Sequence, residues 1–287
     1  MTDLIPGEYD VKLNGLRIHY TIRGSGPALI AHFGGPGLDA RLWGDFAGID
    51  EFSTVIAIHP RGSGLSDPSP DDAYFLRNYV LDVEALRVHL DLEKPILLGW
   101  SHGGFVAQQF AFTYPHSLSK LILLESAAYI GEFLGDIEAA VSHYRSEPWF
   151  EKSFSALEDS FTGKYETDEE KTQLLSHSLK FYFRRFDDRA KVFIDRFKEY
   201  LVTVKPAKVF HREAATMDLR PKLRDITVST LVLVGRHDFI TNVAMAEEMT
   251  KHIPNARLEI FEDSGHFVPI EEQEKYYRLV KQFVLGT

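Results

Sequence analysis

Cysteine is absent from this 287-residue chain. Without thiols there is no disulfide framework, no thiolate metal site and no cysteine nucleophile. No apolar run approaches the roughly 20 residues of a membrane span, and the stretch from Met1 to Glu8 has neither the basic nor the apolar region of a signal peptide. We therefore expect a cytoplasmic protein with no membrane partner.

Excess positive charge is also lacking. The formal net charge is −10, with 32 Lys and Arg against 42 Asp and Glu, which argues against nucleic acid as a partner. Hydrophobic residues make up 44% and charged residues 26%, as in ordinary globular proteins. The length suits one large domain, or one domain carrying an insertion.

The stretch from Leu97 to Phe105, LLGWSHGGF, is the most informative in the chain. The apolar run Pro95–Leu98 predicts a buried strand, and the residues from Phe105 predict a helix. Between them lies the pattern G-x-S-x-G around Ser101, which is typical of a nucleophile on a strained strand-to-helix turn. The pattern alone is weak evidence for a nucleophile, because a glycine-rich strand-to-helix turn can contain a serine by chance.

The rest of the chain alternates buried strands with helices. Alternation of apolar and polar residues around Asn14-Gly15 predicts an opening hairpin. Short apolar runs predict further strands at 28–31, 55–58, 121–124, 230–234 and 258–261, and helical spacing appears at 76–90 and 270–285. This alternation predicts a mostly parallel sheet covered on both faces, whose ligands bind at the carboxyl ends of the strands.

Residues 129–218 break this rhythm, and no convincing strand appears there. Thr167 to Glu170 has the form of a capping box, which predicts a helix running toward Phe186. The segment is rich in aromatic residues. We expect a helical cap over the substrate pocket; the alternative is that most of these rings pack the cap's own small core.

Two polar residues complete a candidate catalytic set with Ser101. A serine hydroxyl needs a general base, and the base needs an orienting acid. Asp238 follows the strand 230–234, and His266 follows the strand that ends at Phe261. The order nucleophile, acid, base is that of the α/β-hydrolase arrangement. Glu125, after the strand 121–124, is an alternative acid or a polar group of the pocket.

Nearly the whole chain resembles an α/β-hydrolase-fold enzyme on these motifs. Residues 33–37, FGGPG, are similar to the HGGPG signature of proline iminopeptidases, with Phe33 in place of the histidine. Residues 61–66 match the R-G-x-G-x-S loop of that family, although His59 stands where an aspartate usually precedes it. The resemblance implies an oxyanion hole formed by the backbone N–H groups of Gly35 and His102.

The resemblance also implies an architecture. It consists of a mostly parallel eight-stranded sheet with helices on both faces, a core formed by residues 1–128 and 219–287, and an inserted helical cap at 129–218. No cofactor is implied. The histidines at 32, 59, 102 and 237 lack ligand-like spacing, so no metal site is expected.

The implied function is a serine hydrolase acting on a small molecule or short peptide, with aminopeptidase activity of the proline-iminopeptidase type as the leading hypothesis. His102 replaces the tryptophan that such enzymes typically carry beside the nucleophile. They also use cap glutamates to bind the substrate ammonium, and the candidates here are Glu147, Glu151, Glu158 and Glu213.

A carboxylesterase, a lactonase or a C–C-bond hydrolase with the same triad is the alternative, and a non-catalytic binding protein of the same fold is a third. Acidic residues facing Ser101 would favour the aminopeptidase, and an apolar pocket would favour the second class. The sequence does not determine the oligomeric state.

Overall fold

The computed structural model describes residues 4–130 and 137–287. Its centre is an eight-stranded sheet with the order β1-β2-β4-β3-β5-β6-β7-β8. The strands are β1 (Gly7–Leu13), β2 (Leu16–Arg23), β3 (Ala28–His32), β4 (Thr54–Ile58), β5 (Ile96–Trp100), β6 (Lys120–Leu124), β7 (Ser229–Gly235) and β8 (Ala256–Phe261). The predicted α/β-hydrolase fold and its mostly parallel sheet are confirmed.

The only antiparallel pairings within this sheet are those of β1 with β2 and of β2 with β4. The β1–β2 hairpin turns at Asn14 and Gly15, whose φ angles are 48° and 85°. Two consecutive residues with positive φ are what a tight hairpin with the usual strand twist requires, so the predicted hairpin is confirmed. From β4 to β8 all neighbours run parallel.

The parallel strands are apolar throughout because both faces of the sheet are buried. In β6, Leu121 and Leu123 belong to one hydrophobic core, whereas Ile122 and Leu124 belong to the other. Successive side chains of a strand point to opposite faces, so an uninterrupted apolar run supplies both cores.

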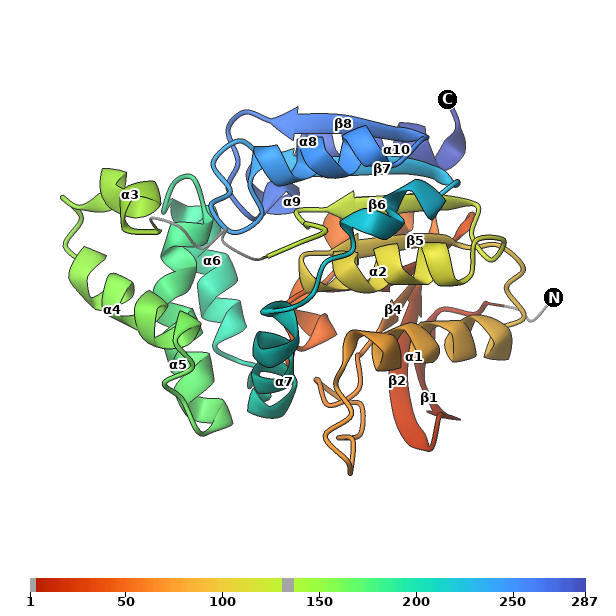
Figure 1. Ribbon diagram of the computed structural model, residues 1–287, viewed down its shortest axis with the longest axis horizontal. Helices are drawn as coiled ribbons and strands as arrows, with labels where there is room; N and C mark the ends of the chain where they lie inside the picture. Colours follow the sequence, from red (N-terminus) through yellow and green to blue (C-terminus); the bar gives the residue numbers. More distant parts are fainter. Residues whose placement is uncertain (1–3, 131–136) are drawn as a thin grey trace.

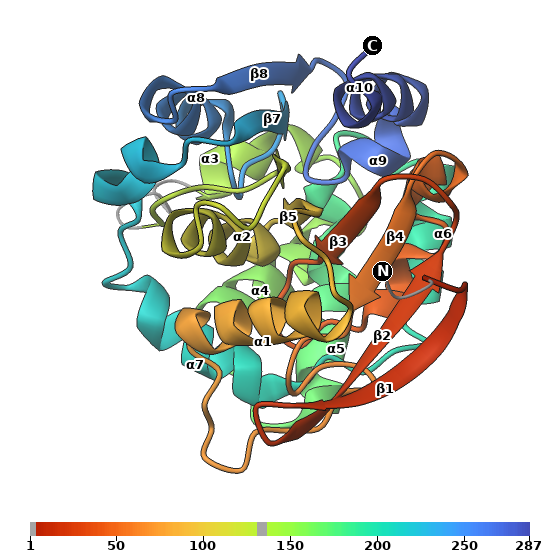
Figure 2. The same ribbon diagram turned by 90° about the vertical axis from the view of Figure 1, so that its right-hand side faces the viewer.

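Helices cover both faces (Figures 1 and 2). Side chains of α1 (Leu76–His89), α2 (His102–Thr113) and α8 (Val243–His252) pack into one core. The opposite core receives α10 (Gln273–Leu285) and the 3₁₀ segment η2 (Phe46–Glu51). The sheet is thus a middle layer, as the predicted alternation of strands and helices requires.

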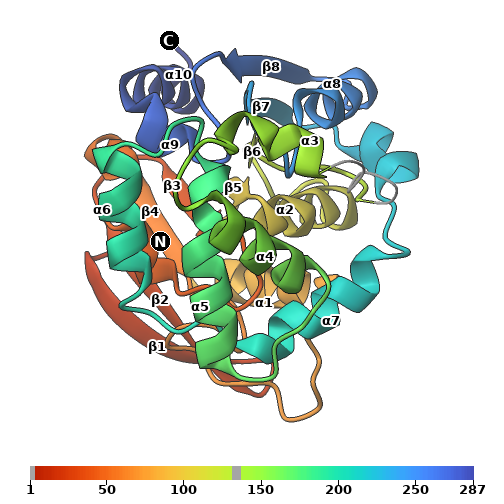
Figure 3. The ribbon, with the colours of Figure 1, turned by 90° about the vertical axis from the view of Figure 1, so that its left-hand side faces the viewer.

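Among the described residues, five α-helices lie between β6 and β7 in the chain, and we call these helices and the segments that join them the cap. They are α3 (Ile137–Val141), α4 (Phe150–Phe161), α5 (Asp168–Ser178), α6 (Asp188–Phe197) and α7 (Val204–Ala214). Figure 1 shows α3 to α6 at the end of the sheet where the parallel strands terminate, and Figure 3 views the molecule from this side. The division of the chain at residues 128 and 219 remains a prediction.

Two predicted helices are interrupted. The capping box at Thr167 and Glu170 is present, but α5 ends at Ser178, and after the 3₁₀ turn η5 (Leu179–Tyr182) the chain is extended at Phe183. Here the Tyr182 carbonyl accepts a hydrogen bond from the His266 N–H at 2.6 Å. The Tyr182 carbonyl thus bonds to a distant backbone N–H rather than to the next turn of a continued helix.

The C-terminal helix, predicted as one element from Ile270, is two. α9 (Val268–Glu271) precedes α10, and Glu272 between them is non-helical. The Glu272 carboxylate accepts hydrogen bonds from Asp263 N and Ser264 Oγ. The break lets this side chain hold the loop that carries His266.

Candidate active site

Ser101 occupies the sharp turn between β5 and α2. Its φ of 51° lies in the left-handed region, which costs energy for a residue with a side chain. A Cβ on Gly103 would lie 1.9 Å from the His32 carbonyl oxygen, and one on Gly99 would lie 2.3 Å from the Gly103 carbonyl oxygen. The two glycines of G-x-S-x-G are therefore required by the close approach of the backbone.

His266 contacts both other members of the predicted set. It lies in the loop after β8, and its Nε2 is 3.1 Å from Ser101 Oγ, while its Nδ1 is 2.7 Å from Asp238 Oδ2. His266 and Asp238 are buried, whereas Ser101 is partly exposed. Segments 165 and 28 residues from His266 along the chain thus meet at one edge of the sheet, as predicted.

Asp238 is held in place by its own loop. Its Oδ1 accepts hydrogen bonds from the N–H groups of Ile240 and Thr241, and its Oδ2 accepts one from Thr241 Oγ1 as well as contacting His266. These hydrogen bonds fix the orientation of the carboxylate. The role of Thr241 was not found from the sequence, although an aspartate followed by a threonine three residues later is a signal for such a turn.

Glu125 lies beyond hydrogen-bonding contact with His266. Its Oε2 accepts from Trp100 Nε1 at 2.7 Å, and its Oε1 accepts from Val268 N at 3.0 Å. Complete burial, with Asp238 nearby, raises the pKa of this carboxyl well above its usual value. Asp238, rather than Glu125, contacts His266. Glu125 instead connects β5 to the start of α9 through its two hydrogen bonds.

Gly35 and His102, the expected oxyanion-hole residues, flank Ser101. His102 begins α2, and the first N–H groups of a helix have no intrahelical acceptor. Gly35 lines the same cavity as Ser101 and His266. The neighbouring Gly34 packs so closely that a Cβ there would lie 2.4 Å from Ser101 Cβ. The FGGPG loop therefore passes directly beside Ser101.

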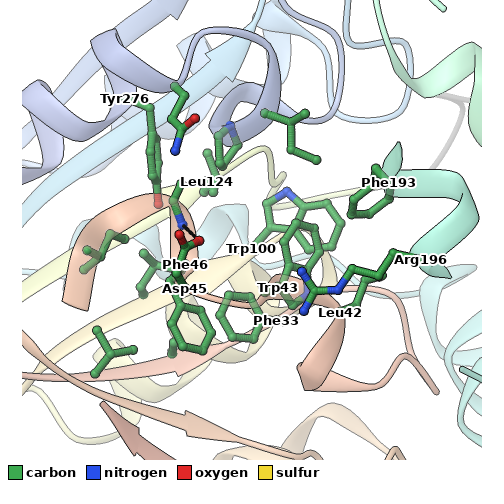
Figure 4. A pocket seen from close by; sticks show the side chains of 18 of the residues that line it. Phe33, Leu42, Trp43, Asp45, Phe46, Trp100, Leu124, Phe193, Arg196 and Tyr276 are labelled. Carbon is green, nitrogen blue, oxygen red and sulfur yellow. Dashed lines mark hydrogen bonds between the residues drawn. The ribbon is translucent and has the colours of Figure 1, made fainter. Parts of the chain in front are cut away.

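Two cavities meet at Trp100. Ser101 and His266 line a cavity of about 210 Å³ beneath the cap, and a larger cavity of about 470 Å³ lies on the other side of Trp100, Leu42 and Phe193, which line both. Phe33 stacks on Trp43 and Phe46 in the larger cavity (Figure 4). The Phe33 ring thus forms part of the wall of the larger cavity.

Apolar side chains dominate the wall of the Ser101 cavity. Those from the cap are Phe161, Leu175, Leu179, Tyr182, Phe193, Phe197, Val202, Ala207 and Phe210. Tyr182 belongs to the aromatic-rich segment that was expected to form the cap, and its ring packs edge-on against His266 at a centroid distance of 5.7 Å. Several aromatic residues of the cap therefore face the pocket rather than only the cap's own core.

None of the four candidate glutamates of the cap lines this cavity. Glu147, Glu151 and Glu158 are exposed, and the Glu213 carboxylate accepts a hydrogen bond from Leu76 N at 2.8 Å. Among the described residues, no aspartate or glutamate lines the wall. Its ionisable cap residues are instead basic or phenolic: Lys171, His211, Tyr165 and Tyr182.

The remaining histidines have other environments. Burial lowers the pKa of His32 to about 4 and that of His102 to about 3, so both are neutral at pH 7. His59 Nδ1 accepts a hydrogen bond from Leu65 N. Within residues 4–130 and 137–287, no group of three or more His, Asp or Glu side chains is placed to hold a metal ion.

Residues 27–273 match the family described as alpha/beta hydrolase fold. The match covers most of the chain, and the chain belongs to this family. No helix within the described ranges is both long enough and apolar enough to cross a bilayer.

Relatives of known name fall into more than one class of hydrolase. The chain is 26% identical over 294 residues to a proline iminopeptidase of Saccharolobus solfataricus, covering 95% of this chain and 90% of the relative. It is 25% identical over 262 residues to a 2-hydroxy-6-oxo-2,4-heptadienoate hydrolase of Pseudomonas putida, covering 90% and 88%. The structure of the enol-lactonase from Burkholderia xenovorans LB400 superimposes with a TM-score of 0.76 at 22% identity, covering 96% of this chain and all of the other.

Proposed function

We propose that this chain is a serine hydrolase that cleaves small esters or lactones through an acyl-enzyme, with Ser101 as nucleophile, His266 as general base and Asp238 as orienting acid. The observation that carries the proposal is the position of His266, whose two ring nitrogens lie 3.1 Å from Ser101 Oγ and 2.7 Å from Asp238 Oδ2. These are the hydrogen bonds that a serine triad needs.

The reaction takes two steps. Ser101 Oγ bonds to the substrate carbonyl carbon and its proton passes to His266 Nε2, while the N–H groups of Gly35 and His102 stabilise the oxyanion. The carbonyl double bond re-forms as the single bond between the carbonyl carbon and the alcohol oxygen breaks, and the leaving alkoxide takes the proton from His266. A water molecule, deprotonated by His266, releases the acid and restores Ser101. Asp238 stabilises the imidazolium in both steps.

The wall of the cavity supports an ester or lactone substrate over an aminopeptidase substrate. An amino-terminal ammonium in a small apolar cavity needs a carboxylate partner, because an unpaired buried charge is costly. The wall provides Lys171 instead, and a second cation beside it would be repelled.

Aminopeptidase activity of the proline-iminopeptidase type is the second candidate. It is favoured by the GGPG sequence after Phe33 and by the proline iminopeptidase among the relatives. A C–C-bond hydrolase with the same triad is a further alternative. One relative is named as a hydrolase of 2-hydroxy-6-oxo-2,4-heptadienoate.

The test compares p-nitrophenyl butyrate with prolyl- and alanyl-naphthylamide. We expect the ester to be cleaved faster and Ser101→Ala to lower kcat by a factor on the order of 10⁴ to 10⁶. Ser53→Ala is the matched control, since Ser53 is a buried serine next to the amino end of β4 and its loss should leave turnover unchanged. Undiminished turnover by Ser101→Ala would overturn the triad, and faster cleavage of the prolyl amide would establish the second candidate.

A further inference from the structure

A buried lysine without a carboxylate partner lines the Ser101 cavity. Lys171 lies on α5 and is only 8% exposed. Its Nζ donates a hydrogen bond to Ser160 Oγ at 2.9 Å and lies 4.1 Å from the centre of the Tyr165 ring. Within the described ranges no aspartate or glutamate forms an ion pair with it. Lys171 is thus an ammonium with protein contacts but no counter-ion.

One nearby lysine, Lys208, has a carboxylate partner. Lys208, on α7, lies 6.0 Å from the centre of the same Tyr165 ring, but it is paired with Glu166 at 2.5 Å and does not line the cavity. Buried charges are normally paired, because an isolated one costs several kcal/mol. An unpaired ammonium facing a cavity is therefore better explained by a ligand than by stability.

Other features of the cavity also suit an anion. An ammonium has three donors, of which Ser160 takes one. His211 lines the cavity beside Lys171, and burial together with Lys171 lowers the pKa of its imidazole. Burial also lowers the pKa of Lys171, to about 8, so most of the amine remains protonated at pH 7. The wall therefore carries positive charge, and none of the described residues lining it supplies negative charge.

We infer that Lys171 binds the carboxylate of an acidic substrate, so that the natural substrate is an ester or lactone with a second, ionised acid group remote from the scissile carbonyl. This inference rests on the proposed function and names the substrate class of the same site. Ser160 and Tyr165 orient the ammonium, and Ser101 and His266 lie in the same cavity to receive the carbonyl.

The experiment uses two p-nitrophenyl esters with the same six-carbon acyl chain. One is the half-ester of adipate, which ends in a carboxylate, and the other is the hexanoate, which ends in a methyl group. We expect the wild type to have the higher kcat/KM for the adipate ester. In Lys171→Met the adipate-to-hexanoate ratio of kcat/KM should fall about 30-fold, mainly through KM, because a charge-assisted hydrogen bond is lost.

Lys208→Met is the matched control. It removes a lysine over the same aromatic ring but outside the cavity, and its ratio should equal that of the wild type. Equal efficiency toward both esters in the wild type would overturn the inference without any variant. A ratio that Lys171→Met leaves unchanged would overturn it as well.

Binding separates this inference from the proposed function. Calorimetry with Ser101→Ala protein measures the affinity for each intact ester without turnover. Tighter binding of the adipate ester, lost in Ser101→Ala/Lys171→Met, supports the lysine site even if Ser101 proves not to be the nucleophile. Ser101-dependent turnover with no preference for the adipate ester overturns the lysine site and leaves the triad standing.

Discussion

At the scale of single residues, Lys171 has an environment that its local sequence does not indicate. It follows Asp168, Glu169 and Glu170 in the first turns of α5, where a lysine would be expected to lie in solvent beside acidic neighbours. Instead it is buried and lines the cavity, whereas none of these three acidic residues does. Burial keeps water away from the amine and therefore lowers the pKa of Lys171.

This environment predicts a pH dependence of substrate preference. Burial lowers the pKa of Lys171 to about 8, so the ammonium loses its proton as the pH rises through 8. Because only the charged form attracts a carboxylate, we expect the adipate-to-hexanoate ratio of kcat/KM to be highest near pH 7 and to fall about tenfold or more by pH 9.5. Steady-state kinetics at half-unit steps of pH would measure it.

The adipate-to-hexanoate ratio of kcat/KM separates the effect of Lys171 from that of other titrating groups. A group that affects the turnover of both esters alike cancels from the ratio. Of the side chains that face the amine, Ser160 does not titrate in this range, burial raises the pKa of Tyr165, and the lowered pKa of His211 keeps its imidazole neutral above pH 7. Lys171→Met should give a flat ratio, and a wild-type ratio that stays constant from pH 7 to 9.5 would contradict the prediction.

At the scale of secondary-structure elements, a buried ion pair joins the loop after β4 to α1. Arg61 Nε lies 2.6 Å from Asp82 Oδ2, its Nη2 lies 2.7 Å from Asp82 Oδ1, and its Nη1 donates to the Ala73 carbonyl at 3.0 Å. Asn14 Nδ2 donates to the same Asp82 from the β1–β2 turn. One carboxylate therefore connects three separate segments, and the R-G-x-G-x-S loop is a structural element of the core.

Arg61→Met should lower the free energy of unfolding by about 3–5 kcal/mol, because it leaves the Asp82 charge buried and uncompensated. Urea denaturation followed by circular dichroism would measure the loss. Arg220→Met is the matched control, since Arg220 pairs with Asp218 at 2.8 Å on the surface, and an exposed pair contributes less than about 1 kcal/mol. Equal decreases in the free energy of unfolding in the two variants would show that the buried pair stabilises the fold no more than the exposed pair does.

At the scale of the whole molecule, Glu271 joins the cap to the loop that carries His266. This α9 residue accepts a hydrogen bond from Arg184 N of the cap on Oε1 and one from Gly265 N on Oε2, both at 2.7 Å. Burial raises the pKa of its carboxyl to about 7 despite these donors. Because Gly265 precedes His266, whose own N–H donates to the Tyr182 carbonyl, the cap and His266 share one hydrogen-bonded junction.

Glu271→Ala should therefore impair both stability and turnover. Two buried N–H groups lose their acceptor, which predicts a decrease of about 2–4 kcal/mol in the free energy of unfolding. Displacement of His266 predicts a decrease of kcat by roughly 10- to 100-fold for neutral and acidic esters alike. Thermal unfolding and initial rates would measure the two effects.

Glu271→Gln serves as the graded control, because the amide keeps the length of the side chain and one acceptor oxygen. It should lose less in both measurements than Glu271→Ala. A Glu271→Ala protein with the kcat of the wild type would mean that the cap does not help to position His266.

The sequence by itself determined the sheet, the motif order and the meeting of Ser101, Asp238 and His266 at one edge. These features follow from short-range rules: apolar runs of strand length form buried strands, glycines permit the turn at Ser101, and parallel strands bring the loops that follow them to the same edge. The capping box of α5 is equally local.

Only the tertiary structure decided where α5 ends, what Glu125 contacts, and which charge lines the pocket. Each depends on segments distant in sequence: Tyr182 bonds to His266, Glu125 bonds to Val268, and Lys171 enters a wall built from several cap helices and the core. A helix pattern does not specify how the helix rotates against its neighbours. That rotation placed a lysine, and none of the four candidate glutamates, in the cavity with Ser101.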